Sequence, residues 1–109
     1  METTTGEAAQ QIHVISDDEH GNHLILTGPF DAYMAQDLRR CALDLLASGQ
    51  DVAVDLTDVE SIDVSGIQVL LALGRDLSTR GKKLVVSGTG PNANRCFRLA
   101  GIAGLLPVS

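Results

Sequence analysis

The 109-residue sequence predicts a single α/β domain, built on a mixed sheet of four to five strands with helices mainly on one side. Two observations lead to this fold class. Short apolar runs of strand length alternate along the chain with longer segments whose apolar residues recur at helical spacing. In addition, a strand–helix–strand connection requires a crossover, so we expect the central strands to be parallel. The length matches one ordinary domain with its own buried core.

The N-terminal part of the sequence predicts a polar tail and a hairpin. Residues 1–10 favour a mobile polar tail, so the domain itself is expected over residues 11–109. Apolar and polar residues alternate over 11–16 and again over 23–27, which is the period of a half-buried strand. Gly21 and its polar neighbours form a turn signal between them, so the two strands are expected to pair as a hairpin.

Three helices separated by short apolar strands are expected in the rest of the chain. Asp31 is a good N-cap for the first helix, and a glycine follows each helix as a stop signal. Residues 105–108 fit either a short strand or a helix. The expected helices cover 31–48, 65–79 and 92–100, and the strands between them cover 52–56 and 84–86.

The composition excludes several classes of function. The net charge of −6 and the isoelectric point near 4.7 disfavour a phosphate backbone as partner, and only 3% of residues are aromatic. We therefore expect no nucleic-acid partner. No signal-peptide pattern and no apolar run of membrane-spanning length is present, so no membrane insertion is expected. Cys41 and Cys96 lie far apart with no CxxC pair, which favours a reducing, cytoplasmic setting.

A histidine-rich turn and a glycine-rich turn are the other motifs that carry possible chemistry. His13, His20 and His23 lie near the acidic residues 17–19, but a polar hairpin tip explains this pattern better than a metal site. The segment 88–90 (Gly-Thr-Gly) precedes a helix but lacks the full phosphate-binding patterns, which favours a tight turn. We therefore expect neither a metal nor a cofactor.

The most informative stretch is the one in which a strand leads into the second helix. Ser65 and Gln68 match the N-cap and N3 positions of a capping box. At about 100° per residue, Ser65, Val69, Ala72 and Asp76 fall in a narrow sector opposite the apolar side of this helix. We therefore expect an exposed face that is small and partly apolar, which suits a covering protein partner.

Two interpretations of Ser65 follow from this position, and they can hold together. Serine is common at helix N-caps for purely structural reasons. A helix N-terminus also offers free N–H donors and the positive end of the helix dipole, which suit a phosphate on that same serine. Such a phosphate would add about −1.5 to −2 charges beside Asp63 and would change what can dock there.

The order and spacing of several segments resemble the STAS family, which contains the anti-sigma factor antagonists and their relatives. The central signature is Val54-Asp55-Leu56-Thr57 followed by Ile62-Asp63-Val64-Ser65-Gly66-Ile67. Further matching segments are Gly28-Pro29-Phe30-Asp31, Arg80-Gly81-Lys82-Lys83-Leu84 and the stretch from Arg95 to Gly101. Together they cover nearly the whole chain.

This resemblance implies a mixed sheet with helices largely on one side and a serine or threonine phosphoacceptor directly before the signature glycine. That acceptor position is Ser65 in this sequence. Val64 stands where many members have Ser or Thr, which leaves the acceptor intact but removes a neighbouring hydroxyl.

The partner that the resemblance implies is a serine-kinase anti-sigma factor. It would dock on the face that carries Gly66, Gln68, Val69 and Ala72, phosphorylate Ser65 from ATP and then dissociate, and a phosphatase would reset the switch. The chain would be a cytoplasmic binding module and not an enzyme, and a monomer when free.

Three aspartates are expected near the phosphosite, because they lie close to the carboxyl ends of predicted strands, where open α/β sheets usually bind ligands. Asp31, Asp55 and Asp63 could orient the Ser65 hydroxyl or lie near the metal of a kinase. The structural alternative is N-capping by Asp31 and simple loop solvation of Asp63.

Two alternatives to the switch stay open. In the first, the chain is a non-switching scaffold in a chemotaxis-type signalling system or an accessory subunit of a transporter assembly, and Ser65 is only a helix cap. In the second, the chain is an enzyme or small-ligand binder that uses its three aspartates. No nucleophile–base pair with a plausible sequence context supports the second alternative.

Overall fold

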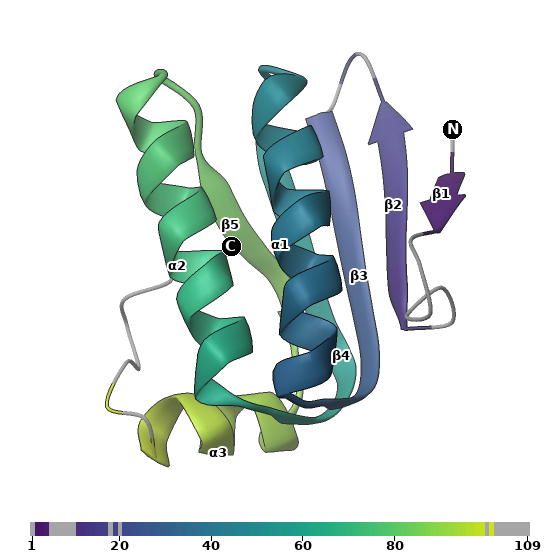
Figure 1. The fold of residues 1–109 in the computed structure, drawn as a ribbon, viewed down its shortest axis with the longest axis vertical. Helices are drawn as coiled ribbons and strands as arrows, with labels where there is room; N and C mark the ends of the chain where they lie inside the picture. Colours follow the sequence, from purple (N-terminus) through teal and green to yellow (C-terminus); the bar gives the residue numbers. More distant parts are fainter. Residues whose placement is uncertain (1, 5–10, 18, 20, 100, 102–109) are drawn as a thin grey trace.

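A computed structural model describes residues 2–4, 11–17, 19, 21–99 and 101. Its five-stranded sheet has the strand order β1-β2-β3-β4-β5. The helices α1 and α2 lie side by side on one face of this sheet, and α3 crosses the end of the sheet at which α1 and α2 begin (Figure 1). The expected α/β class, with a mixed sheet and helices mainly on one side, is therefore confirmed.

The sheet is antiparallel in its N-terminal part and parallel in its C-terminal part. The antiparallel part joins β1 to β2 and β2 to β3, whereas β4 pairs parallel with both β3 and β5. The strands are β1 (Glu2–Thr4), β2 (Ile12–Asp17), β3 (Gly21–Phe30), β4 (Val52–Ile62) and β5 (Leu84–Thr89). The parallel pairs follow from the two crossovers through helices, as expected.

The N-terminal tail differs from its expectation where the structure describes it. Residues 2–4 form the edge strand β1 against β2, although residues 1–10 were expected to be a mobile tail. A short polar sequence gives little strand signal by itself, so its pairing depends on the open edge that β2 offers. Residues 5–10 lie outside the described part of the chain, as do residues 105–108, for which the sequence fits either a strand or a helix.

The helices match their expected bounds to within one residue at nearly every end. They are α1 (Ala32–Ala47), α2 (Val64–Thr79) and α3 (Pro91–Leu99). Gly49 and Gly81 follow α1 and α2 with φ values of +71° and +73°, the left-handed conformation that glycine adopts without steric cost. The glycine stop signals are thus confirmed for both helices.

β4 is twice as long as the sequence predicted, and this extension positions the candidate site. Residues 57–62 continue the strand although most of them are polar and exposed. Only Val59 and Ile62 are buried in this part, and the register against β3 shifts twice along it. Since Phe30 pairs with Ile62, β3 and β4 end at the same level. The helices that follow them, α1 and α2, therefore begin side by side.

A continuous apolar core fills the space between the sheet and the helices. It combines the inward residues of the strands with the inner faces of α1 and α2, and α3 adds Ala93 and Phe97. Cys41 lies in this core, and burial and the nearby Asp44 raise the pKa of its thiol to about 11. Cys41 and Cys96 are both free thiols. Across the described residues, no helix combines the length and the apolar character needed to cross a membrane.

Candidate functional site

The N-terminus of α2 carries the candidate site, and its helix cap is Asp63 rather than Ser65. Asp63 has extended backbone angles, and its carboxylate accepts hydrogen bonds from the Ser65 backbone N–H at 3.1 Å and from the Ser65 hydroxyl at 2.6 Å. The expected capping box of Ser65 and Gln68 is therefore wrong. Asp63 lies between the last residue of β4 and the first residue of α2 and is the N-cap, which places Ser65 within the first turn.

Ser65 itself is half-buried, and its hydroxyl donates its proton to Asp63. This hydrogen bond is the main reason why the pKa of the exposed Asp63 carboxyl is lowered from its usual value of 3.8. The Ser65 backbone N–H adds to the same effect. At neutral pH the cap is thus a carboxylate that fixes the orientation of the serine side chain.

The amide groups of the first turn are already occupied. Gly66 N and Ile67 N donate to the backbone carbonyl oxygen of Asp63 at 3.0 and 3.1 Å, and Ser65 N donates to its side chain. From the sequence we expect free N–H donors that would hold a phosphate on Ser65. In the structure these three donors all have partners, so a phosphate would have to share or displace them.

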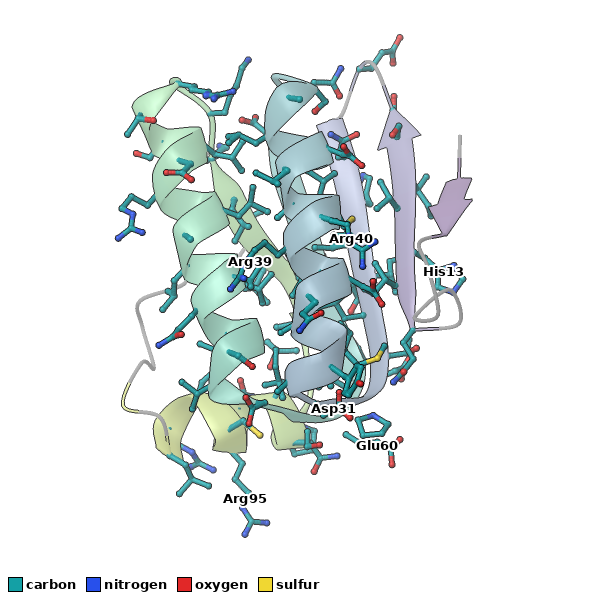
Figure 2. All side chains as sticks on the ribbon, in the orientation of Figure 1. His13, Asp31, Arg39, Arg40, Glu60 and Arg95 are labelled. Atoms are coloured by element: carbon teal, nitrogen blue, oxygen red, sulfur yellow. The ribbon has the colours of Figure 1, made fainter. Side chains whose placement is uncertain are left out.

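Asp31 lies beside Asp63 because their two strands end at the same level. Asp63 N donates to the Phe30 carbonyl oxygen at 2.8 Å, and the Asp31 carboxylate caps α1 by accepting from Met34 N at 3.0 Å. N-capping is confirmed for Asp31, and Asp63 has the same role rather than simple loop solvation. Figure 2 shows Asp31 and Glu60 at this same end of the molecule, together with Arg95 of α3.

Asp55 does not join this cluster. Seven residues of β4 separate it from Asp63, and its carboxylate accepts instead from Thr57 N at 2.9 Å and from the Thr57 hydroxyl at 2.6 Å. A Cβ atom on Gly88 would lie 2.6 Å from both side-chain oxygens of this pair. The expectation that all three aspartates lie near the phosphosite is therefore wrong for Asp55, and Gly88 belongs to a strand rather than to a turn.

The expected partner-binding residues divide between the core and the surface. Gln68 is exposed and Ala72 is half-buried, but Gly66 and Val69 are buried, with Val69 only 6% exposed. The expectation that Val69 lies on an exposed face is therefore wrong. Because α2 packs against α1 as well as against the sheet, its buried arc is wider than one apolar stripe and includes Val69.

Gly66 is required for the close approach of α2 to the preceding strand. A Cβ atom there would lie 3.2 Å from Ile62 Cγ1 and 3.6 Å from Phe30 Cδ1. The glycine of the Ser-Gly signature thus lets the helix begin directly against the end of the sheet. This packing holds Ser65 at the start of the helix, in contact with the capping Asp63.

A groove between α1 and α2 was not predicted from the sequence. Its volume is about 540 Å³, and it contains Val69 and Ala72 from the expected partner face. The one signal in the sequence was Leu43, a large apolar residue outside the buried stripe of α1, which is 62% exposed. We call this feature the α1–α2 groove; it is lined by Arg39, Ala42, Leu43, Leu46, Gln68, Val69, Leu71, Ala72, Leu73, Arg75 and Asp76.

The described residues contain no group of three or more His, Cys, Asp or Glu side chains placed to hold a metal ion. Of the three histidines considered above, His13 and His23 lie on β2 and β3, and His20 lies outside the described residues. A zinc or calcium site would need ligands from several converging side chains.

A family model described as "Mlab, STAS domain" matches residues 13–107. The chain belongs to the STAS domain family. The resemblance inferred from the signature around Ser65 is thereby confirmed.

Named relatives of this STAS domain are anti-sigma factor antagonists. The anti-sigma-B factor antagonist of Bacillus subtilis (strain 168) is 23% identical over 95 residues, which cover 87% of either chain. The protein of the same name from Listeria monocytogenes is 26% identical over 87 residues, which cover 78% of this chain and 75% of the relative.

Solved structures show the same fold. The anti-sigma factor antagonist SpoIIAA in its unphosphorylated form matches with a TM-score of 0.74 at 13% identity, over 90% of this chain and 87% of its own. The phosphorylated form of Bacillus SpoIIAA matches with a TM-score of 0.69 at 14% identity, over 90% of each chain. An anti-sigma factor antagonist from Mycobacterium paratuberculosis matches with a TM-score of 0.74 at 22% identity, over 90% of this chain and 83% of its own.

Proposed function

We propose that this STAS domain is a phosphorylation-switched regulatory module that docks on a serine-kinase anti-sigma factor. The observation that carries the proposal is the Ser65 hydroxyl, which lies at the first turn of α2 and is oriented by the Asp63 carboxylate at 2.6 Å. The names of the relatives support the choice of partner. The chain acts as a ligand and substrate in the cytoplasm, as a monomer when free, and not as an enzyme.

In the phosphorylation step, Ser65 Oγ attacks the γ-phosphorus of ATP held by the kinase. A new P–O bond forms, the bond to the leaving ADP breaks, and the hydroxyl proton must leave. Asp63 orients the hydroxyl but is a poor final acceptor, because the pKa of its carboxyl is lowered. We therefore assign the proton to a base of the kinase and a positioning role to Asp63.

A phosphate on Ser65 would end the complex with the kinase through electrostatic repulsion. It adds about −1.5 to −2 charges at the end of α2 that the Asp63 carboxylate caps, while Asp31 caps the start of α1. The serine oxygen also loses the proton that it donates to Asp63, so attraction is replaced by repulsion at this contact. A docking surface that fits the neutral hydroxyl no longer fits the modified one, until a phosphatase removes the phosphate.

One observation favours the second candidate, a non-switching scaffold or accessory subunit. Val64 is 54% exposed directly beside Ser65, where many family members carry a hydroxyl. An exposed apolar side chain at this position suits a permanent contact as well as a transient one. In that case Ser65 contributes only the two hydrogen bonds to the capping aspartate.

Incubation of the chain with its cognate anti-sigma kinase and ATP tests the switch. Intact-mass spectrometry should show the gain of one phosphate. Ser65→Ala should abolish the gain, while Ser78→Ala, which changes an exposed serine on the same helix, should not. Ser65→Asp should weaken binding to the kinase. Binding without any modification of the wild type would favour the scaffold, and modification at another residue would contradict the proposal.

A further inference from the structure

The α1–α2 groove combines a largely apolar lining with two arginines and one aspartate. Its floor contains the small side chains Ala42 and Ala72 and the buried Val69, and its wall contains Leu43, which is 62% exposed. A single exposed apolar side chain is common on protein surfaces, but Leu43 adds to the apolar lining of a groove, and larger apolar patches mark interaction sites. The lining residues run from Arg39 to Leu46 on α1 and from Gln68 to Asp76 on α2, so an elongated occupant could contact residues of both helices.

The charges at the rim differ from those of the chain as a whole. Arg39 from α1 and Arg75 from α2 both line the groove and are exposed. Figure 2 shows the Arg39 side chain in the space between the two helices. The neighbouring Arg40 pairs with Asp37 at 2.7 Å, whereas neither Arg39 nor Arg75 makes an ion pair within the described residues. Asp76 also lines the groove, so on a chain of net charge −6 the groove presents two guanidinium groups and one carboxylate.

We propose that the α1–α2 groove binds an amphipathic helix of a partner protein, with acidic residues beside its apolar stripe. The groove residues on α1 run from Arg39 to Leu46, which corresponds to about 10 Å or two helical turns at 1.5 Å per residue. Two turns of a helix present apolar side chains at i, i+3, i+4 and i+7, enough to fill such a trough. Carboxylates that flank this stripe would pair with Arg39 and Arg75, bidentately where the geometry allows.

This inference deepens the proposed function and rests on it in one respect, because it takes α2 as the partner-facing helix. Ser65 begins α2, and the groove follows the same helix from Gln68 to Asp76. If a kinase bound the groove with one of its helices, its active site could therefore lie close to Ser65. The groove would supply the binding energy and the serine the regulation.

The test uses the full chain and a fluorescent synthetic helical peptide with leucines at i, i+3, i+4 and i+7 and glutamates beside them. Fluorescence anisotropy should show saturable binding, and a matched peptide with lysines for glutamates should bind about tenfold more weakly at low salt. Leu43→Asp and Arg39→Glu should each weaken binding of the glutamate peptide about tenfold. Leu99→Asp, which changes a residue of α3 that is 79% exposed, serves as the matched control and should leave it unchanged.

Several outcomes would overturn the inference. These are the absence of saturable binding, equal binding of the two peptides, and equal losses in the groove and control variants. A wild-type dimer in sedimentation that Leu43→Asp dissolves would also overturn it, because the occupant would be a second copy of the chain. Since the assay contains no kinase, Ser65→Ala should bind the peptide as the wild type does. Failure of the switch and failure of the groove are thus distinguishable.

Discussion

Val69 allows the orientation of α2 to be tested by one substitution. The side chain is 6% exposed, and Val69→Ala removes two methyl groups from a nearly complete burial. At about 0.8 kcal/mol per buried group, the lost transfer free energy is about 1.5 kcal/mol. The better helix propensity of alanine returns at most about 0.5 kcal/mol. We therefore expect the free energy of unfolding to fall by about 1 kcal/mol, with a further loss if a cavity remains.

Val64→Ala is the matched control, because it makes the same change on the same helix at a side chain that is 54% exposed. Here the lost burial, about 0.7 kcal/mol, and the gain in propensity nearly cancel. Urea unfolding monitored by circular dichroism gives both values, with an unchanged m-value as the sign that only stability differs. If Val69→Ala were neutral or stabilising, as expected for an exposed valine, the described packing of α2 against α1 would be refuted.

Three further predictions concern stability and reactivity. Gly90→Ala should lower the free energy of unfolding by about 1–3 kcal/mol, because its Cβ would lie 2.7 Å from a backbone carbonyl oxygen of β4. Gly74→Ala should raise the free energy of unfolding by about 0.5–1 kcal/mol, because Gly74 lies in a helix and its added Cβ would make only an ordinary 3.7 Å contact. Urea titrations in which the two variants change stability in the same direction would contradict these predictions. The lowered pKa of the Asp63 carboxyl contributes stability above its usual value of 3.8 that is lost as pH falls through the folded-state pKa. Thermal melts of Asp63→Asn should therefore lose part of the acid sensitivity of the wild type, and identical pH profiles would argue against this coupling. Because the pKa of Cys41 is raised to about 11, a thiol reagent at pH 8 should modify Cys96 first and Cys41 only on unfolding, whereas equal rates would show that Cys41 is accessible.

Much of the fold was predictable because the strong local signals agree with the tertiary structure. The apolar stripe of α1, its Asp31 cap and its glycine stop all specify one helix, and the structure places its bounds where expected. The second half of β4 was not predictable from its composition. Residues 57–62 are mostly polar and form a strand because β3 continues beside them, a pairing that no local window contains.

The candidate site was predictable in its location but not in its detail. The Ser65 signature placed the site at the start of α2, yet a serine and an aspartate two residues apart both suit an N-cap. Only the exact end of β4 decides between them. The buried position of Val69 depends on a neighbour in space, because a helical wheel records one helix and cannot show that α1 covers a second side of α2.

The occupied first turn of α2 determines how a phosphate on Ser65 can act. A helix end with free amide donors would hold the phosphate and could drive a rearrangement within the domain. Here the Asp63 carboxylate accepts a hydrogen bond from the Ser65 backbone N–H, and the Asp63 carbonyl oxygen accepts hydrogen bonds from the next two backbone N–H groups. On the proposal that Ser65 is phosphorylated, the phosphate would meet the Asp63 carboxylate rather than free donors and would extend into solvent. A switch of this kind needs no change of fold, because the signal is the altered charge at the point where the partner must make contact.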